Sequence, residues 1–227
     1  MRHPASFASV AVFALGVAWC NSAAVPREGE REDMAQKDVA IVEEVSPGVG
    51  DLRRFDLIAA GRSVELGRDG RLVLGYLKSC WQDSIIGGRA VVEPLKSLVE
   101  GGALTRQRVE CDAAGLAQMN SAGLSARGGA SLAGPALPEP DVNLYGLSPI
   151  VISAQAGLLV IERLDATAPP LRLELAENRV DLHEKDVALA AGGLYRFTRG
   201  QASIVVRIDS LAEPGRAPAV GRLVIFR

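Results

Sequence analysis

The sequence predicts an all-β protein with two β domains joined by a linker. Its 227 residues are 48% hydrophobic and 23% charged, a balance typical of folded rather than disordered chains. The 24 Gly and 12 Pro divide the apolar residues into short runs, which favours strands and turns. In the last portion of the chain apolar and polar residues alternate, as they do in strands with one buried face.

A targeting segment comes first. Residues 1–24 begin with the positive Arg2, continue through the apolar stretch Ala5–Trp19 and end in small residues. That stretch is short for a bilayer core of about 30 Å. We therefore predict a signal peptide that is removed after Ala24 and sends the chain to the periplasm or outside the cell. The alternative is a retained anchor helix.

Cys20 offers a second interpretation of this segment. Val17–Cys20 resembles the lipobox of bacterial lipoproteins, in which the cysteine is acylated. Trp19 departs from that pattern, which has a small residue before the cysteine. Lipidation of Cys20 is thus an alternative, and we expect membrane contact only through that lipid or through a retained signal peptide.

The mature chain is expected to begin with a flexible leader, residues 25–37, which is polar and poor in large apolar side chains. A first β domain follows over residues 38–112, where apolar runs such as Val39–Val42 and Leu72–Leu74 are separated by turn residues. Leu66–Leu72 contains Asp-Gly, which tolerates the positive φ of a tight turn, and is predicted to form a hairpin.

Two Gly-Gly segments follow in the same domain. Ser84–Glu93 and Ser97–Leu104 each pass from an apolar pair through Gly-Gly into another apolar pair, which predicts strand corners. A glycine-rich loop can instead hold phosphate, but that use requires a strand, the loop and a helix in order, with a characteristic spacing. Neither segment has this arrangement, so turns are favoured.

The order of motifs in the first domain points to a family. An apolar strand before Ser46–Gly50 is followed by Ile58–Leu66, Asp69–Leu74 and Tyr76–Cys80. This order, over about a third of the chain, resembles the FecR-like domain of bacterial envelope proteins. The resemblance implies a β-sandwich or barrel in the periplasm and supplies no catalytic residue. Well-known members signal through a membrane helix to a sigma factor, a layout from which we expect this chain to depart.

Two cysteines remain in the mature chain, Cys80 and Cys111. Exported proteins meet an oxidising compartment, so we predict a Cys80–Cys111 disulfide. A redox or metal role is the alternative, but the sequence has neither C-x-x-C nor a nearby histidine to support it.

The rest of the chain is expected to be a linker and a second domain. Residues 113–143 are dominated by Ala, Gly, Ser and Pro, which predicts a flexible linker. Residues 144–227 are predicted to form an immunoglobulin-like β-sandwich of about seven or eight short strands. The apolar runs and alternating positions that mark these strands are Ile150–Ile152, Leu158–Ile161, Leu171, Leu173, Leu175, Val180, Leu182, Val187, Leu189, Tyr195, Phe197, Ile204, Val206, Ile208, Leu223 and Ile225.

Candidate reactive groups are few. His183, the one histidine of the mature chain, lies in a charged stretch, which favours an exposed position over a metal ligand. One histidine is enough for a Ser-His-Asp site, which would use His183, but no G-x-S-x-G elbow accompanies it. Carboxylate pairs such as Glu43 with Glu44 or Glu174 with Glu177 could serve a glycosidase, although scattered charges of this kind are solvated surface by default.

The aromatic residues are expected to have structural roles. Trp81 follows Cys80 directly and is predicted to cover the disulfide rather than stack on a sugar or a peptide. Tyr195 and Phe197 share a strand face and are expected to fill the second core rather than form a binding platform.

These observations favour an exported, non-enzymatic envelope protein that acts by binding, as a scaffold or a signalling accessory. A net charge of −2 argues against nucleic-acid binding, which requires a basic surface. We predict no catalytic, metal or cofactor residue, and a partner that is an envelope protein or a cell-wall glycan. The linker would let the two domains hold separate partners. The alternatives are an exported hydrolase with a Ser/His or carboxylate site and a lipid-anchored envelope regulator.

Overall fold

The computed structural model describes residues 37–120, 137–215 and 217–227. The predicted signal peptide, Cys20 and nearly all of the predicted leader lie outside the described residues. Strands dominate the described part of the chain, which confirms the all-β class. No helix in that part is both long and apolar enough to cross a membrane.

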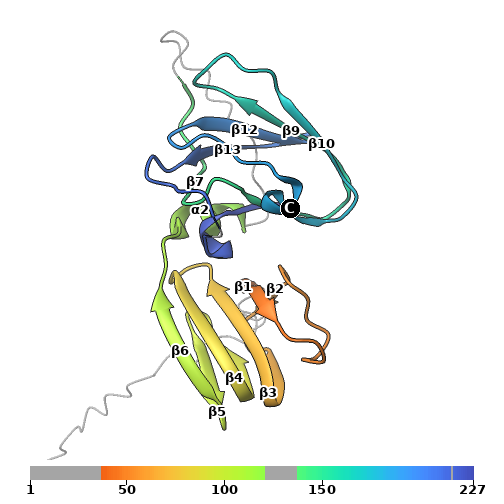
Figure 1. The fold of residues 1–227 in the computed structure, drawn as a ribbon, viewed down its shortest axis with the longest axis vertical. Coiled ribbons are helices and arrows are strands. Elements are labelled where there is room, and N and C mark those ends of the chain that lie inside the picture. Colours follow the sequence, from red (N-terminus) through yellow and green to blue (C-terminus); the bar gives the residue numbers. More distant parts are fainter. Residues whose placement is uncertain (1–36, 121–136, 216) are drawn as a thin grey trace, which may run out of the picture.

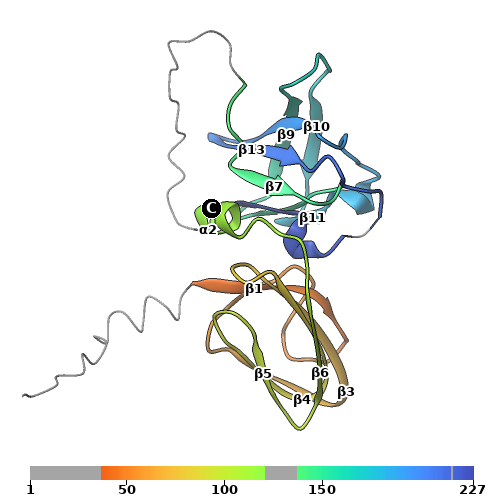
Figure 2. The same ribbon diagram turned by 90° about the vertical axis from the view of Figure 1, so that its left-hand side faces the viewer.

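The first body, here called unit 1, is a single six-stranded sheet that curls around its own core (Figures 1 and 2). Its strands are β1 (Asp38–Val45), β2 (Leu57–Ala59), β3 (Ser63–Tyr76), β4 (Trp81–Val92), β5 (Ser97–Glu100) and β6 (Ala103–Arg108). The order is β2-β1-β3-β4, after which β6 pairs with the first half of β4 and β5 pairs with its second half.

The Gly-Gly segments form the predicted corner and turn. Gly87 and Gly88 have φ of +69° and +71° and stand where β4 passes from β6 to β5. Gly101 and Gly102 connect β5 to β6 beside them, and a Cβ on Gly88 would lie only 2.2 Å from the Glu100 carbonyl oxygen. Backbone therefore packs on backbone here, and only glycine fits.

The predicted Leu66–Leu72 hairpin is wrong, because the segment lies inside β3. β3 pairs with β4 on both sides of it, and the ladder shifts between Gly67 and Arg71. The Asp-Gly dipeptide therefore forms a bulge opposite the glycine corner of β4 and bends the strand without reversing it.

The second body, here called unit 2, contains two sheets over a common core (Figure 1). The five-stranded sheet has the order β10-β9-β12-β13-β7, and the three-stranded sheet has the order β11-β8-β14. The strands are β7 (Val142–Leu144), β8 (Ile150–Ser153), β9 (Gly157–Arg163), β10 (Leu171–Leu175), β11 (Arg179–Asp181), β12 (Leu194–Arg199), β13 (Ala202–Ile208) and β14 (Leu223–Phe226). Pairs β7/β13 and β8/β14 are parallel, and the immunoglobulin-like topology stays a prediction.

Two details of unit 2 differ from the predicted pattern. Val187 and Leu189 lie in a loop, and Leu182 begins the short 3₁₀ helix η1 (Leu182–Lys185) instead of extending β11. Asp181 terminates the strand because its side chain accepts a hydrogen bond from the His183 backbone N–H and so caps that helix.

The predicted linker, residues 113–143, is ordered at both described ends. Ala113–Met119 forms helix α2, capped by Asp112, and β7 begins at Val142. The alanine-rich composition that suggested a spacer also suits a helix, and the Leu116 and Met119 side chains are buried in the core of unit 2. Residues 121–136 lie outside the described part.

The two units are in contact through buried side chains and ion pairs. Ile41, Phe55 and Leu77 of unit 1 belong to the same hydrophobic cluster as the core of unit 2. Ion pairs cross the junction as well, including Arg179 with Asp56 at 2.7 Å and Arg227 with Asp38 at 2.7 Å. In the described residues the two units thus share core contacts and ion pairs, and their division into two domains joined by a flexible linker stays a prediction.

Candidate binding groove

A groove of about 620 Å³ lies at the junction of the two units. Its roof is the loop that carries the 3₁₀ helix η2 (Ala219–Gly221), just before β14. Unit 1 supplies the floor and one end. The lining residues are Glu43, Glu44, Val45, Arg54, Phe55, Arg71, Val73, Gln82, Ser84 and Gln107 from unit 1, and Ala217, Pro218, Ala219 and Arg222 from unit 2.

A β-bulge brings Glu43 and Glu44 into this groove together. The ladder between β1 and β3 shifts between Val42 and Glu44, which leaves Glu43 as an extra residue. The sequence suggested that this pair of carboxylates is solvated surface. Glu44 is indeed exposed and pairs with the Arg71 Nε at 3.2 Å, whereas Glu43 is only partly exposed.

The Glu43 carboxylate is held by both units. Its Oε2 accepts a hydrogen bond from the Gln82 Nε2 at 2.7 Å, and its Oε1 accepts one from the Val220 backbone N–H at 3.5 Å. Gly75 makes this possible, since a Cβ there would lie 2.4 Å from that Oε1. Burial raises the pKa of Glu43, although these hydrogen bonds and the nearby Arg222 charge favour its ionised form.

A chain of amides crosses the floor of the groove. The Gln107 Nε2 donates to the Gln82 Oε1 at 2.5 Å, and the Gln82 Nε2 donates to Glu43, so the chain runs from β6 over β4 to β1. The Ser84 hydroxyl lies in the same lining. The floor thus presents amide and hydroxyl groups, which suit neutral polar ligand groups such as peptide bonds or sugar hydroxyls.

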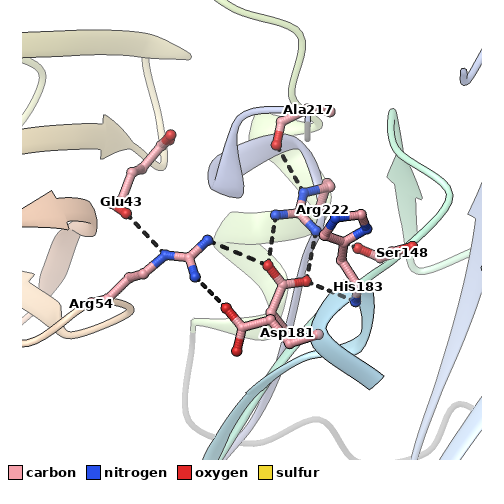
Figure 3. A network of polar contacts seen from close by, with 8 residues as sticks. Glu43, Arg54, Ser148, Asp181, His183, Ala217 and Arg222 are labelled. Carbon is pink, nitrogen blue, oxygen red and sulfur yellow. Dashed lines mark hydrogen bonds and ion pairs between the residues drawn. The ribbon is translucent and has the colours of Figure 1, made fainter. Parts of the chain in front are cut away.

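Arg54 and Phe55 form one end of the groove. Figure 3 shows the Arg54 guanidinium between Glu43 and Asp181: its Nε donates to the Glu43 backbone carbonyl at 3.3 Å and its Nη2 lies 3.5 Å from the Asp181 Oδ2. It also pairs with Glu184 and lies 4.3 Å above the Phe55 ring.

Phe55 holds an unusual backbone conformation at this place. Its φ of +68° is rare for a bulky residue and costs free energy, which the buried contacts of its ring with unit 2 offset. A second hollow, of about 790 Å³, lies on the other side of Arg54 and Phe55. Residues 54 and 55 therefore separate two hollows at the junction.

A buried ion pair supports the roof. Arg222 is the largest fully buried side chain and binds Asp181, the Ser148 carbonyl and the Ala217 carbonyl (Figure 3). Burial alone would raise the pKa of Asp181, but the hydrogen bonds and positive charge of Arg222 outweigh it and lower that pKa. The loop before β14 is thus fixed to β11.

The other candidate reactive residues, His183, Glu174 and Glu177, lie outside the lining of the groove. The described hydrogen bonds of His183 are made by its backbone: its N–H donates to Asp181 and its carbonyl accepts from the Asp186 N–H. No hydrogen bond joins its imidazole to a serine or an acid in the described residues. Glu174 is exposed on β10, and Glu177 lines the second hollow. No cluster of three or more potential metal ligands occurs in the part of the chain that the structure describes.

The predicted disulfide between Cys80 and Cys111 is confirmed. Tyr195 and Phe197 are buried in the core of unit 2, as predicted. Trp81 is partly buried against the core of unit 1, with the Arg108 guanidinium 5.7 Å from its ring centroid. The polar groups of the groove, Gln82, Gln107 and Arg54, were not predicted, because single polar residues in strands and loops carry no local signal.

No protein-family model, curated protein or solved structure matches this chain. The FecR-like resemblance of unit 1 therefore stays a prediction.

Proposed function

We propose that the protein is an exported envelope protein that acts by binding a partner in the groove between its two units, without catalysing a reaction. The chain of amides from Gln107 through Gln82 to Glu43 carries this proposal. It offers hydrogen-bonding groups on a floor of paired strands, a rigid arrangement that limits the entropy lost on binding. The FecR-like character of unit 1 and a scaffold or signalling role belong to the same proposal.

Export is supported by the disulfide, because such bonds persist in oxidising compartments. The lining favours a polypeptide partner over a cell-wall glycan. Phe55 is the single aromatic residue among the described residues of the lining and is only 6% exposed, so these residues offer no open ring on which a sugar could stack.

Retention of envelope components by the immobilised chain, residues 25–227, tests the proposal. Envelope extract and purified sacculi are applied to the wild type and to Ser84→Trp, which fills the floor of the groove. Glu174→Trp is the matched control, since it adds the same ring on an exposed strand of unit 2. We expect Ser84→Trp to lose retention and the control to keep it.

Two outcomes would contradict this proposal. One is equal retention by the wild type and Ser84→Trp, provided that both have the same circular-dichroism spectrum. The other is no retention of any envelope component by the wild type. If the wild type retains sacculi and no envelope protein, the partner is a cell-wall glycan and not a polypeptide.

A further inference from the structure

Strand β6 is an open sheet edge next to the groove. In the described residues it pairs only with β4, and five of its six residues are exposed. Gln107 belongs both to this strand and to the groove lining. A chain that binds along β6 would therefore also reach the amide floor.

The hydrogen-bond pattern shows which backbone groups are open. The Val109 N–H donates to the Cys80 carbonyl at 2.9 Å, which fixes the phase of the antiparallel ladder between β6 and β4. Because bonded and non-bonded pairs alternate, the N–H and C=O groups of Leu104, Arg106 and Arg108 point away from β4. An additional strand requires such a row of unpaired groups.

The side chains of these three residues also suit an added strand. Leu104 is 38% exposed and lies opposite the buried Ile85. Inward charges usually protect an edge from pairing, but Arg106 is neutralised by Asp83, with Nε–Oδ1 at 2.6 Å and Nη2–Oδ2 at 2.8 Å.

Arg108 is the third residue of the row. Its guanidinium contacts the Trp81 ring and makes no ion pair with an acid in the described part of the chain. A negative side chain of a partner strand would therefore find an uncompensated charge there, four residues from the apolar Leu104.

We infer that β6 accepts an extended segment of a partner polypeptide as an additional strand, with an apolar residue opposite Leu104 and an acidic residue opposite Arg108. This inference rests on the proposed binding function and names the partner class and its mode of docking. The alternate side chains of the added strand face the side of the sheet that carries Gln107 and Ser84.

A matched pair of substitutions isolates the backbone contact. Leu104→Pro removes an N–H that points away from β4, so it leaves the ladder intact, and Leu104→Thr changes the side chain but keeps the N–H. The probe is the peptide Ser-Glu-Thr-Val-Thr-Leu-Ser-amide with fluorescein at its N-terminus, followed by anisotropy. Bound antiparallel to β6, it places its Leu opposite Leu104 and its Glu opposite Arg108. We expect Leu104→Pro to bind about tenfold more weakly than Leu104→Thr, the effect of one lost hydrogen bond and its steric block.

A charge exchange provides a second test that does not depend on proline. Replacing the Glu of the probe by Lys should weaken its binding to the wild type severalfold, and Arg108→Glu should reverse this preference, as expected for an exposed ion pair. Equal binding of both probes to the wild type and to Arg108→Glu, equal binding by the two Leu104 variants, or no binding by the wild type overturns the inference.

The envelope experiment separates this inference from the proposed function. If Ser84→Trp abolishes retention of an envelope protein and Leu104→Pro leaves it unchanged, the groove binds the partner but β6 does not, and strand addition is wrong. If the wild type retains no envelope component, the proposed function fails, whatever the peptide shows about β6.

Discussion

Arg222 donates two hydrogen bonds to Asp181, from Nη1 to Oδ1 at 2.9 Å and from Nη2 to Oδ2 at 3.1 Å, in a place that solvent does not reach. Nη1 also donates to the Ser148 carbonyl, and Nε donates to the Ala217 carbonyl. The pair thus ties β11, the loop before β8 and the roof of the groove together. The pair fixes the positions of these elements more than it adds stability, because the cost of removing two charges from water offsets much of their attraction.

Arg222→Met should lower the free energy of unfolding by about 3–5 kcal/mol, because the buried Asp181 carboxylate loses both hydrogen bonds from Arg222 and keeps only the longer Arg54 contact and the His183 N–H. Urea unfolding at neutral pH measures this. Arg196→Met is the control, since Arg196 forms an exposed pair with Glu162 at 3.2 Å and should cost at most about 1 kcal/mol. Similar losses for the two variants would show that the buried Asp181–Arg222 pair stabilises the fold no more than an exposed ion pair does.

Glu43→Gln should change how stability depends on pH. Burial raises the pKa of Glu43 above its ordinary 4.5, so the folded chain binds this proton more tightly than the unfolded chain does. The wild type is therefore favoured at pH values below 4.5 and loses that contribution as the pH rises through the raised pKa. The neutral variant should be the more stable protein at pH 7, and this advantage should disappear in acid.

Urea midpoints at several pH values measure the effect of Glu43→Gln, with Glu44→Gln as the control on the exposed neighbour. The side-chain amides of Gln82 and Gln107 can rotate by 180°, which exchanges their oxygen and nitrogen, so a glutamine at position 43 keeps hydrogen-bond partners. A wild type that exceeds Glu43→Gln in stability by the same amount at every pH would contradict the prediction.

Alternation predicts the strands at Leu171–Leu175 and Ile204–Ile208, where one face is more buried than the other, although Val187 and Leu189 alternate in the same way and lie in a loop. The prediction failed where distant residues decide the outcome. Leu66–Leu72 has the composition of a hairpin, but β4 pairs with both sides of it and keeps the strand continuous. The composition of Ala113–Met119 predicts a linker, but composition alone does not show that unit 2 offers a core for Leu116 and Met119.

The groove was accessible to sequence analysis only in part. Glu43 and Glu44 are visible as two adjacent acids that follow an apolar run, but the bulge that turns both towards the groove depends on the register with β3. The contact between Glu43 and Val220 joins residues 177 positions apart. The cysteine bridge was predictable, because it required only two cysteines and an expected oxidising compartment.

Replacing both Cys80 and Cys111 by serine should lower the free energy of unfolding by about 3–4 kcal/mol in the chain-entropy model, given a sequence separation of 31. Reductant should destabilise the wild type to a similar extent and leave the double variant unchanged. Urea unfolding with and without dithiothreitol measures both effects. Two titratable thiols in the untreated protein would show that the bridge does not form.

Gly88→Ala tests whether backbone contact at the β4 corner holds unit 1 together. Its Cβ would lie 2.2 Å from the Glu100 carbonyl oxygen, and its φ is +71°. We expect a loss of about 2–5 kcal/mol, the sum of the left-handed conformation and the clash. Gly48→Ala separates the two terms, because Gly48 has a φ of +84° but no atom within 4 Å of the added carbon, and it should cost about 1–2 kcal/mol. Urea unfolding measures both losses. Equal losses for the two variants would mean that β5 and β6 can move away from β4 without cost. The open edge of β6 would then lack the rigid support that strand addition requires.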